Sequence, residues 1–73
     1  MTEFVIGGIY QHYKGPRYRV LGLCKHSETE EALVYYECLY PNENGQYWVR
    51  PQAMWGEKVI YEGEEKQRFT LVS

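Results

Sequence analysis

The sequence predicts a mainly β protein, and three features of its 73 residues indicate this class. Residues 17–26 and 32–40 are alternating runs rich in β-branched and aromatic residues, joined by a polar connection of five residues. Strong turn signals, Lys14-Gly15-Pro16 and Asn44-Gly45, separate further short runs. No stretch is patterned for a helix longer than one turn.

Taken in order, the elements fit one small domain over residues 1–73. The expected elements are a short strand or packed arm at 4–6, strands at 9–13, 17–26, 32–40 and 46–50, a helical or 3₁₀ turn within 51–55, and a closing hairpin of 58–61 and 66–72. Pro51 cannot donate a ladder hydrogen bond, so it ends its strand. Five or six strongly bent antiparallel strands with one helical turn near residues 51–55 are typical of a small SH3-like barrel.

The long hairpin predicts which side chains face inward. If the connection is centred on Thr29, the numbers of facing residues sum to about 58. The facing pairs are then Val20 with Cys38, Gly22 with Tyr36 and Cys24 with Val34. Small residues meet large ones, so we take this face as the interior. The opposite face carries an apolar set that needs a cover, such as the arm at 4–6 or a second copy of the protein. This set is Leu21, Leu23, Leu33, Tyr35 and Leu39.

Composition and charge narrow the class of protein. The net charge is −2, but residues 1–26 hold four basic residues against one acidic, whereas the remainder holds four against nine. An acidic chain is a weak candidate for tight, sequence-independent phosphate binding. Two cysteines are too few for a disulfide framework, and the sequence has no leader and no apolar run long enough to span a membrane. We therefore expect a soluble, cytoplasmic protein with reduced thiols and no membrane partner.

Basic and aromatic residues form the main candidate binding surface. Arginines bind phosphates or carboxylates in a bidentate manner, and exposed rings stack on bases or peptide side chains. The competing interpretation is that the rings fill the core while the arginines extend over it. Arg50 lies between Val49 and Pro51 and is expected to need a carboxylate or carbonyl partner, for which Glu28 is a candidate. The candidate ligand-binding residues are His12, Tyr13, Lys14, Arg17, Arg19, His26, Glu28, Trp48 and Arg50.

The segment His26-Ser27-Glu28-Thr29 contains the residue types best suited to catalysis, because an imidazole, two hydroxyls and a carboxylate can support acid–base chemistry. The same residues commonly stabilise turns, which we favour. The histidines with Cys24 or Glu28 lack the paired spacing of zinc sites, so no metal or other cofactor is predicted. Cys24 and the other cysteine fall on the predicted interior face, which favours inert core thiols over nucleophiles.

Three segments together resemble a known family. They are His12-Tyr13-Lys14-Gly15 with Tyr18-Arg19-Val20-Leu21-Gly22, then His26-Ser27-Glu28-Thr29, then Trp48-Val49-Arg50-Pro51 with Met54. They are similar to domain of unknown function 1653, a bacterial family of short uncharacterised proteins, over roughly residues 8–69. Trp55 stands where the family usually has Phe, and Gln67 where a proline commonly precedes the Arg-Phe pair. The resemblance implies a small bacterial β domain and brings no activity or catalytic residue.

The sequence thus favours a non-enzymatic binding or accessory module. Its aromatic and basic surface would hold a peptide, a nucleotide or a nucleic-acid strand. The apolar outer face also leaves open a homodimer. The alternative is a small enzyme with its site around His26, Glu28 and Arg50.

Overall fold

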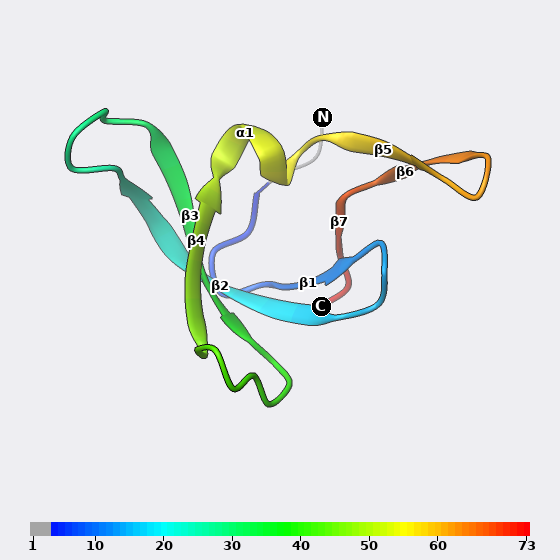
Figure 1. Cartoon of the computed structure of the whole chain (residues 1–73), viewed down its shortest axis with the longest axis horizontal. Coiled ribbons are helices and arrows are strands. Elements are labelled where there is room, and N and C mark those ends of the chain that lie inside the picture. The colour runs from blue at the N-terminus through cyan, green and yellow to red at the C-terminus, as the bar shows by residue number, and fades with distance from the viewer. Residues whose placement is uncertain (1–3) are drawn as a thin grey trace.

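The computed structural model of the protein describes residues 4–73; residues 1–3, the start of the predicted domain, lie outside the described part. Within that part the chain forms seven strands and one short helix (Figure 1). The elements are β1 (Ile9–His12), β2 (Arg17–Lys25), β3 (Ala32–Cys38), β4 (Tyr47–Pro51), α1 (Gln52–Trp55), β5 (Lys58–Tyr61), β6 (Glu64–Gln67) and β7 (Phe69–Leu71). The mainly β class and the short helical turn are confirmed, with seven strands in place of five or six.

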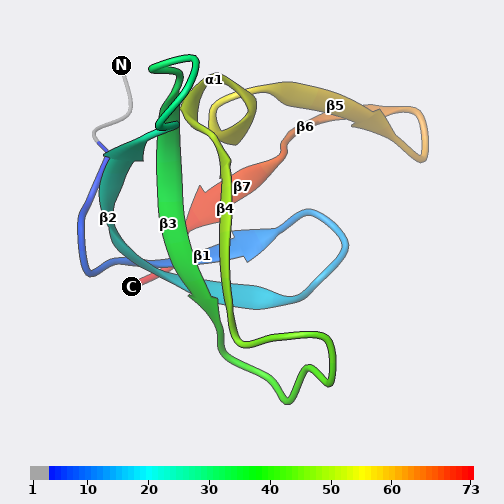
Figure 2. The ribbon, with the colours of Figure 1, turned by 60° about the vertical axis from the view of Figure 1, so that its left-hand side comes forward.

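A five-stranded antiparallel sheet in the order β4-β3-β2-β1-β7 forms the body of the molecule. The long strand β2 pairs with β1 through residues 17–19 and with β3 through residues 18–25, so it belongs to both halves of the sheet. The sheet curls along β2, and β3 and β4 run across β1 and β7 (Figure 2). The two end strands approach each other on the concave side, where the Arg50 guanidinium of β4 lies 5.3 Å from the Phe69 ring of β7.

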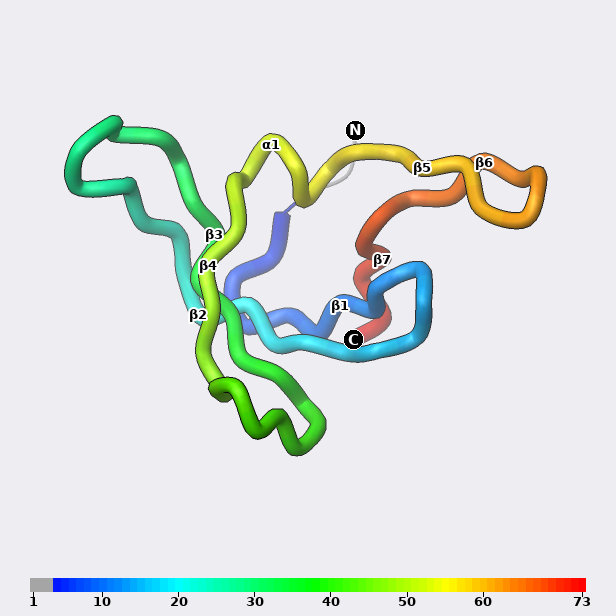
Figure 3. Tube along the Cα trace, in the orientation of Figure 1, coloured from blue at the N-terminus to red at the C-terminus, as the bar shows by residue number. Residues whose placement is uncertain are grey.

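The closing hairpin differs from the sequence prediction, because residues 66–72 are two strands rather than one. Strand β6 pairs with β5 in a separate two-stranded sheet, and β7 pairs with β1. The chain changes sheets at Arg68, whose N–H donates to the Glu57 carbonyl at 2.9 Å. The β5–β6 hairpin projects from the curled sheet (Figure 3). Its two-residue turn, Glu62 and Gly63, has φ values of 53° and 80°, as a type I′ turn requires.

The core lies on the concave side of the curled sheet and is largely aromatic. Its buried members are Tyr10, Tyr18, Val20, Val34, Tyr36, Cys38, Trp55 and Phe69. The helix α1 delivers Trp55, which stacks on Phe69 with ring centroids 3.8 Å apart and an interplanar angle of 3°. Phe4 packs against this cluster, 5.8 Å from the Tyr10 ring, so the segment before β1 is a packed arm and not a strand.

The predicted register of the long hairpin is wrong for two reasons. Lys25 faces Ala32, so the connection is centred between residues 28 and 29 rather than on Thr29, and β2 contains a bulge. Tyr36 faces Val20 rather than Gly22, and the register shifts between these two residues of β2. The extra residue, Leu21, reverses the alternation in the second half of the strand. Val20, Val34, Tyr36 and Cys38 are buried as expected. Cys24 is exposed, contrary to the prediction that it lies in the core.

The predicted outer apolar set is divided by the same bulge. Leu21, Leu23, Tyr35 and Leu39 are exposed, whereas Leu33 is buried. Beyond the bulge Leu23 faces Val34, so it lies on the opposite side of the sheet from Tyr35. On the outer side the neighbours of Tyr35 come from β4 instead, since Val49 faces it directly and the Tyr47 ring lies 6.2 Å away.

Candidate functional site

Arg50 lies on the concave face of β4, among aromatic rings. Its Nε donates to the Tyr36 hydroxyl at 2.9 Å, its Nη1 lies 3.9 Å from the Met54 sulfur, and its Cζ lies 6.0 Å from the centroid of the Tyr36 ring and 5.3 Å from that of Phe69. Among residues 4–73 no carboxylate forms an ion pair with it. The prediction that Glu28 is the partner of Arg50 is therefore wrong. The hydroxyl of Tyr36 accepts the hydrogen bond from the Arg50 guanidinium instead. A guanidinium has five N–H donors, so donors remain for a ligand.

A cavity of about 230 Å³ opens beside Arg50 on the same face. Its lining residues are Tyr18, Tyr36, Cys38, Tyr40, Asn42, Trp48 and Arg50. The hydroxyls of Tyr18 and Tyr40 are hydrogen-bonded at 3.2 Å; this bond, followed by burial, raises the pKa of Tyr40 well above its usual value of 10.0. Tyr40 therefore stays a neutral phenol. Arg50 is the one charged group in this lining, so the cavity has a positive potential.

His12 lies near Arg50, on the β1 side of Phe69. Its ring centroid is 5.0 Å from that of Phe69, the residue that faces it in β7. Burial, followed by the charges of Arg50, Arg68 and Lys14, lowers the pKa of His12 below 6.5. Every charge that shifts this pKa is positive. The structure thus brings His12 and Arg50, predicted as one surface, close together.

Arg68 is a member of this basic group that the sequence analysis missed. It directly precedes Phe69, and its carbonyl accepts a hydrogen bond from the Tyr13 N–H at 3.0 Å. Its Nε is buried and has no hydrogen-bond partner within residues 4–73. No motif marks Arg68, because its proximity to His12 depends on the pairing of β1 with β7.

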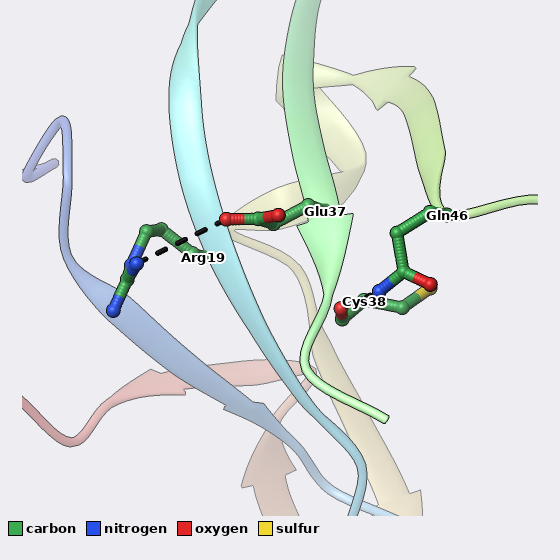
Figure 4. A network of polar contacts seen from close by, with 4 residues as sticks. All are labelled: Arg19, Glu37, Cys38 and Gln46. Carbon is green, nitrogen blue, oxygen red and sulfur yellow. Dashed lines mark hydrogen bonds and ion pairs between the residues drawn. The ribbon is translucent and has the colours of Figure 1, made fainter. Parts of the chain in front are cut away.

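The remaining basic candidates fall into two groups. Tyr13 and Lys14 adjoin His12: the Tyr13 ring lies 4.4 Å from the imidazole, and the Lys14 Nζ lies 5.8 Å from the Tyr13 ring. Arg17 and Arg19 are exposed and alternate with the buried Tyr18, so they point outward. Arg19 forms an ion pair with Glu37 across β2 and β3 at 4.0 Å (Figure 4).

Figure 4 also draws Cys38 and Gln46, which lie at the two ends of the β3–β4 connection next to this site. The side-chain amide of Gln46 donates to the Cys38 carbonyl, and the Cys38 N–H donates to the Gln46 carbonyl at 2.9 Å. These bonds join the end of β3 to the start of β4. They hold Trp48, whose indole N–H donates to the Gly45 carbonyl at 2.9 Å, at the rim of the cavity.

His26 and Glu28 lie in the exposed turn between β2 and β3. The Nδ1 of His26 accepts the Glu28 N–H at 3.1 Å, and Thr29 Oγ1 accepts the Glu31 N–H at 3.2 Å. These are the local bonds of a turn. Neither His26 nor Glu28 lines the cavity beside Arg50, so the geometry gives no support to a shared catalytic site.

Residues 4–73 contain neither a cluster of metal-binding side chains nor a membrane-spanning helix. No group of three His, Cys, Asp or Glu side chains is placed to hold a metal ion. No helix in the same part of the chain is long and apolar enough to cross a membrane.

The fold and this face define a small antiparallel β protein with an aromatic, basic concave surface. Comparison with known proteins shows the family to which the chain belongs. A family model described as "Protein of unknown function (DUF1653)" matches residues 8–71, and the chain belongs to this family, as its motifs indicated. It is similar to the crystal structure of a DUF1653 protein from Bordetella bronchiseptica, with a TM-score of 0.89 and 36% identity over 96% of this chain and 88% of that one. No curated protein matches the sequence.

Proposed function

We propose that the protein is a non-enzymatic binding module that uses its concave face to hold an anionic group carried next to a flat ring. A nucleotide has this chemistry. The observation that carries the proposal is the Arg50 guanidinium, which is half-buried among rings without a carboxylate partner in residues 4–73. A partly desolvated cation is costly unless an anion approaches it. Arginine also presents the planar donor pair that suits phosphate or carboxylate.

The size of the cavity supports recognition of one group rather than of a long ligand. A volume of about 230 Å³ is below the roughly 300–1,000 Å³ of typical small-molecule sites. Trp48, at its rim, is 38% exposed and offers a stacking surface. We infer that one flat ring enters against Trp48 with its phosphate held at the Arg50 end, and that any further ligand lies outside.

Binding of adenosine monophosphate, followed by amide chemical shifts, tests this function. Shifts should change at Tyr36, Trp48 and Arg50, and Arg50→Gln should weaken binding at least tenfold, as expected for loss of a charge-assisted contact. Arg17→Gln removes an exposed arginine on the other face and serves as the matched control. Equal binding by both variants would contradict the proposal.

The same titration with a single-stranded oligonucleotide and with an acidic peptide identifies the carrier of the anion. A nucleic-acid strand should bind with an affinity that falls steeply with salt. A mononucleotide that binds as well as the strand identifies the single group as the ligand. Absent binding of all three probes at low salt removes the binding function.

The homodimer and the cytoplasmic location also remain proposals. An outer patch of Tyr35, Tyr47 and Val49, exposed at 40%, 58% and 50%, supports a dimer more directly than the leucine set does. Light scattering at several concentrations tests it, with Val49→Lys expected to shift a dimer to monomer.

The proposed cytoplasmic location is supported by the thiols. Cys24 is exposed and both cysteines are free, which suits a reducing compartment.

A further inference from the structure

Two basic side chains from distant parts of the sequence lie beside the ring of Phe69, and a third basic residue, Arg68, directly precedes it. The His12 ring centroid lies 5.0 Å from that of Phe69, and the Arg50 Cζ lies 5.3 Å from it. Arg68 directly precedes Phe69 and is tied through its carbonyl to Tyr13, the neighbour of His12. Strand β1, strand β4 and the link between β6 and β7 thus each supply one basic group to this region.

These basic groups have no counter-ion within residues 4–73. The ion pairs in that part join Arg19 to Glu37 and Lys58 to Glu65, and neither pair includes a member of the group. Arg68 Nε is buried without a hydrogen-bond partner. Placing like charges together at a partly buried site is unfavourable unless an anion neutralises them.

We infer that His12, Arg50 and Arg68 together form a site for a tetrahedral dianion of the phosphate class, and that binding of this anion is coupled to protonation of His12. The inference rests on the proposed function and names the class of anion and the groups that hold it. Arg50 is shared between this site and the cavity beside Trp48, so the phosphate would lie on the His12 side of Arg50 and the flat ring on the Trp48 side.

The geometry of His12 explains how the coupling arises. Its Nδ1 accepts the Lys14 N–H at 3.2 Å, so the neutral ring carries its proton on Nε2 and can donate from there. The charged groups facing it, Arg50, Arg68 and Lys14, are all positive and oppose protonation of the ring. A dianion reverses that potential and favours the imidazolium, in which the new Nδ1 proton replaces the hydrogen bond from the Lys14 N–H. His12 also lines an open hollow of about 500 Å³, to which Lys66 contributes a further basic group.

Sulfate is a suitable probe, because it stays a dianion over the range in which histidine titrates. The chain has two histidines, so both imidazoles can be followed by nuclear magnetic resonance, and His26→Gln assigns them. Sulfate should raise the pKa of His12. By reciprocity, sulfate should bind about fivefold or more tightly at about pH 5.5 than at about pH 8. Sodium chloride of equal ionic strength is the control for screening.

Variants separate the roles of His12 and Arg68. His12→Gln should remove the pH dependence and keep weak binding, whereas Arg68→Gln should weaken binding at both pH values. The measurement on the unmodified protein does not depend on any variant folding: a His12 pKa that sulfate leaves unmoved overturns the site. If adenosine monophosphate still binds through Arg50 in that case, the proposed function stands without this site; if neither probe binds, both fall.

Discussion

Replacing Tyr36 with Phe isolates the hydrogen bond that orients Arg50. The change removes one oxygen, the acceptor of the Arg50 Nε–H at 2.9 Å, and retains a ring that is 4% exposed. The contacts of that ring with Tyr18 and Trp55, at centroid distances of 5.1 Å and 5.3 Å, do not need the hydroxyl. The substitution therefore changes one polar interaction and almost no packing.

The magnitude follows from the charge and the burial of the donor. A hydrogen bond to a charged group contributes about 1.5–3 kcal/mol to the free energy of unfolding. Arg50 is only half-buried, so water recovers part of this, and we expect Tyr36→Phe to cost about 1–2 kcal/mol. The midpoint of thermal unfolding should fall by about 4–8 °C for each kcal/mol. Affinity for adenosine monophosphate should also fall, because Arg50 is no longer held in place.

Urea unfolding followed by tryptophan fluorescence measures the effect. The midpoint should decrease while the slope is unchanged, since the surface exposed on unfolding is the same. Tyr35→Phe is the matched control, because Tyr35 is the adjacent residue of β3 and its hydroxyl has no hydrogen bond within residues 4–73; it should change stability by less than about 0.5 kcal/mol. If the two variants are equally stable, Tyr36 does not hold Arg50, and the argument for an oriented cation fails.

Three further predictions test other parts of the structure. Glu62→Asn should stabilise the protein by about 0.5–1 kcal/mol in urea unfolding, because Glu62 has a φ of 53° and Asn tolerates this conformation better; no gain would contradict the turn geometry. A thiol reagent should label the exposed Cys24 quickly and the buried Cys38 only on unfolding, as mass spectrometry can show; equal rates would contradict the bulge in β2. The lowered pKa of His12 means that the folded protein binds this proton more weakly than the unfolded chain, so stability is retained above pH 6.5 and lost as the pH falls below it. Urea unfolding at a series of pH values should show a smaller loss for His12→Gln, and an equal loss would contradict the shift.

The sequence predicts the elements of this fold better than their pairing. Alternation and turn residues are local signals, and they locate the long hairpin and the helical turn after Pro51, while they leave residues 4–6 open between a short strand and a packed arm. The bulge at Leu21 has one weak signal, the adjacent Gly22, because glycine within a strand marks a bend or a bulge without fixing the register. Leucine at 21 and again at 23 suits either face, so the pattern is compatible with a regular strand and with a bulged one. A regular strand is therefore predicted, and it places Cys24 on the wrong face of the sheet.

The same distinction applies to the candidate site. Arg50 could be selected from the sequence, because a lone charge between an apolar residue and Pro51 needs a partner. Its actual partner, the Tyr36 hydroxyl, and its neighbour Arg68 could not be identified. The first depends on the register of β3 with β4, and the second on the pairing of the first strand with the last. Contacts of such long sequence separation leave no spacing to detect.

Net charge is a poor guide to the ligand of this protein. The chain carries −2 in total, which argues against phosphate binding when it is read as an average. A ligand responds to the charges within about one screening length, roughly 8 Å in physiological salt. At His12 the charges that shift the pKa are Arg50, Arg68 and Lys14, with no carboxylate among them. The charges that act on His12 are therefore positive although the chain is acidic, and on the proposed function an anion should bind at the concave face.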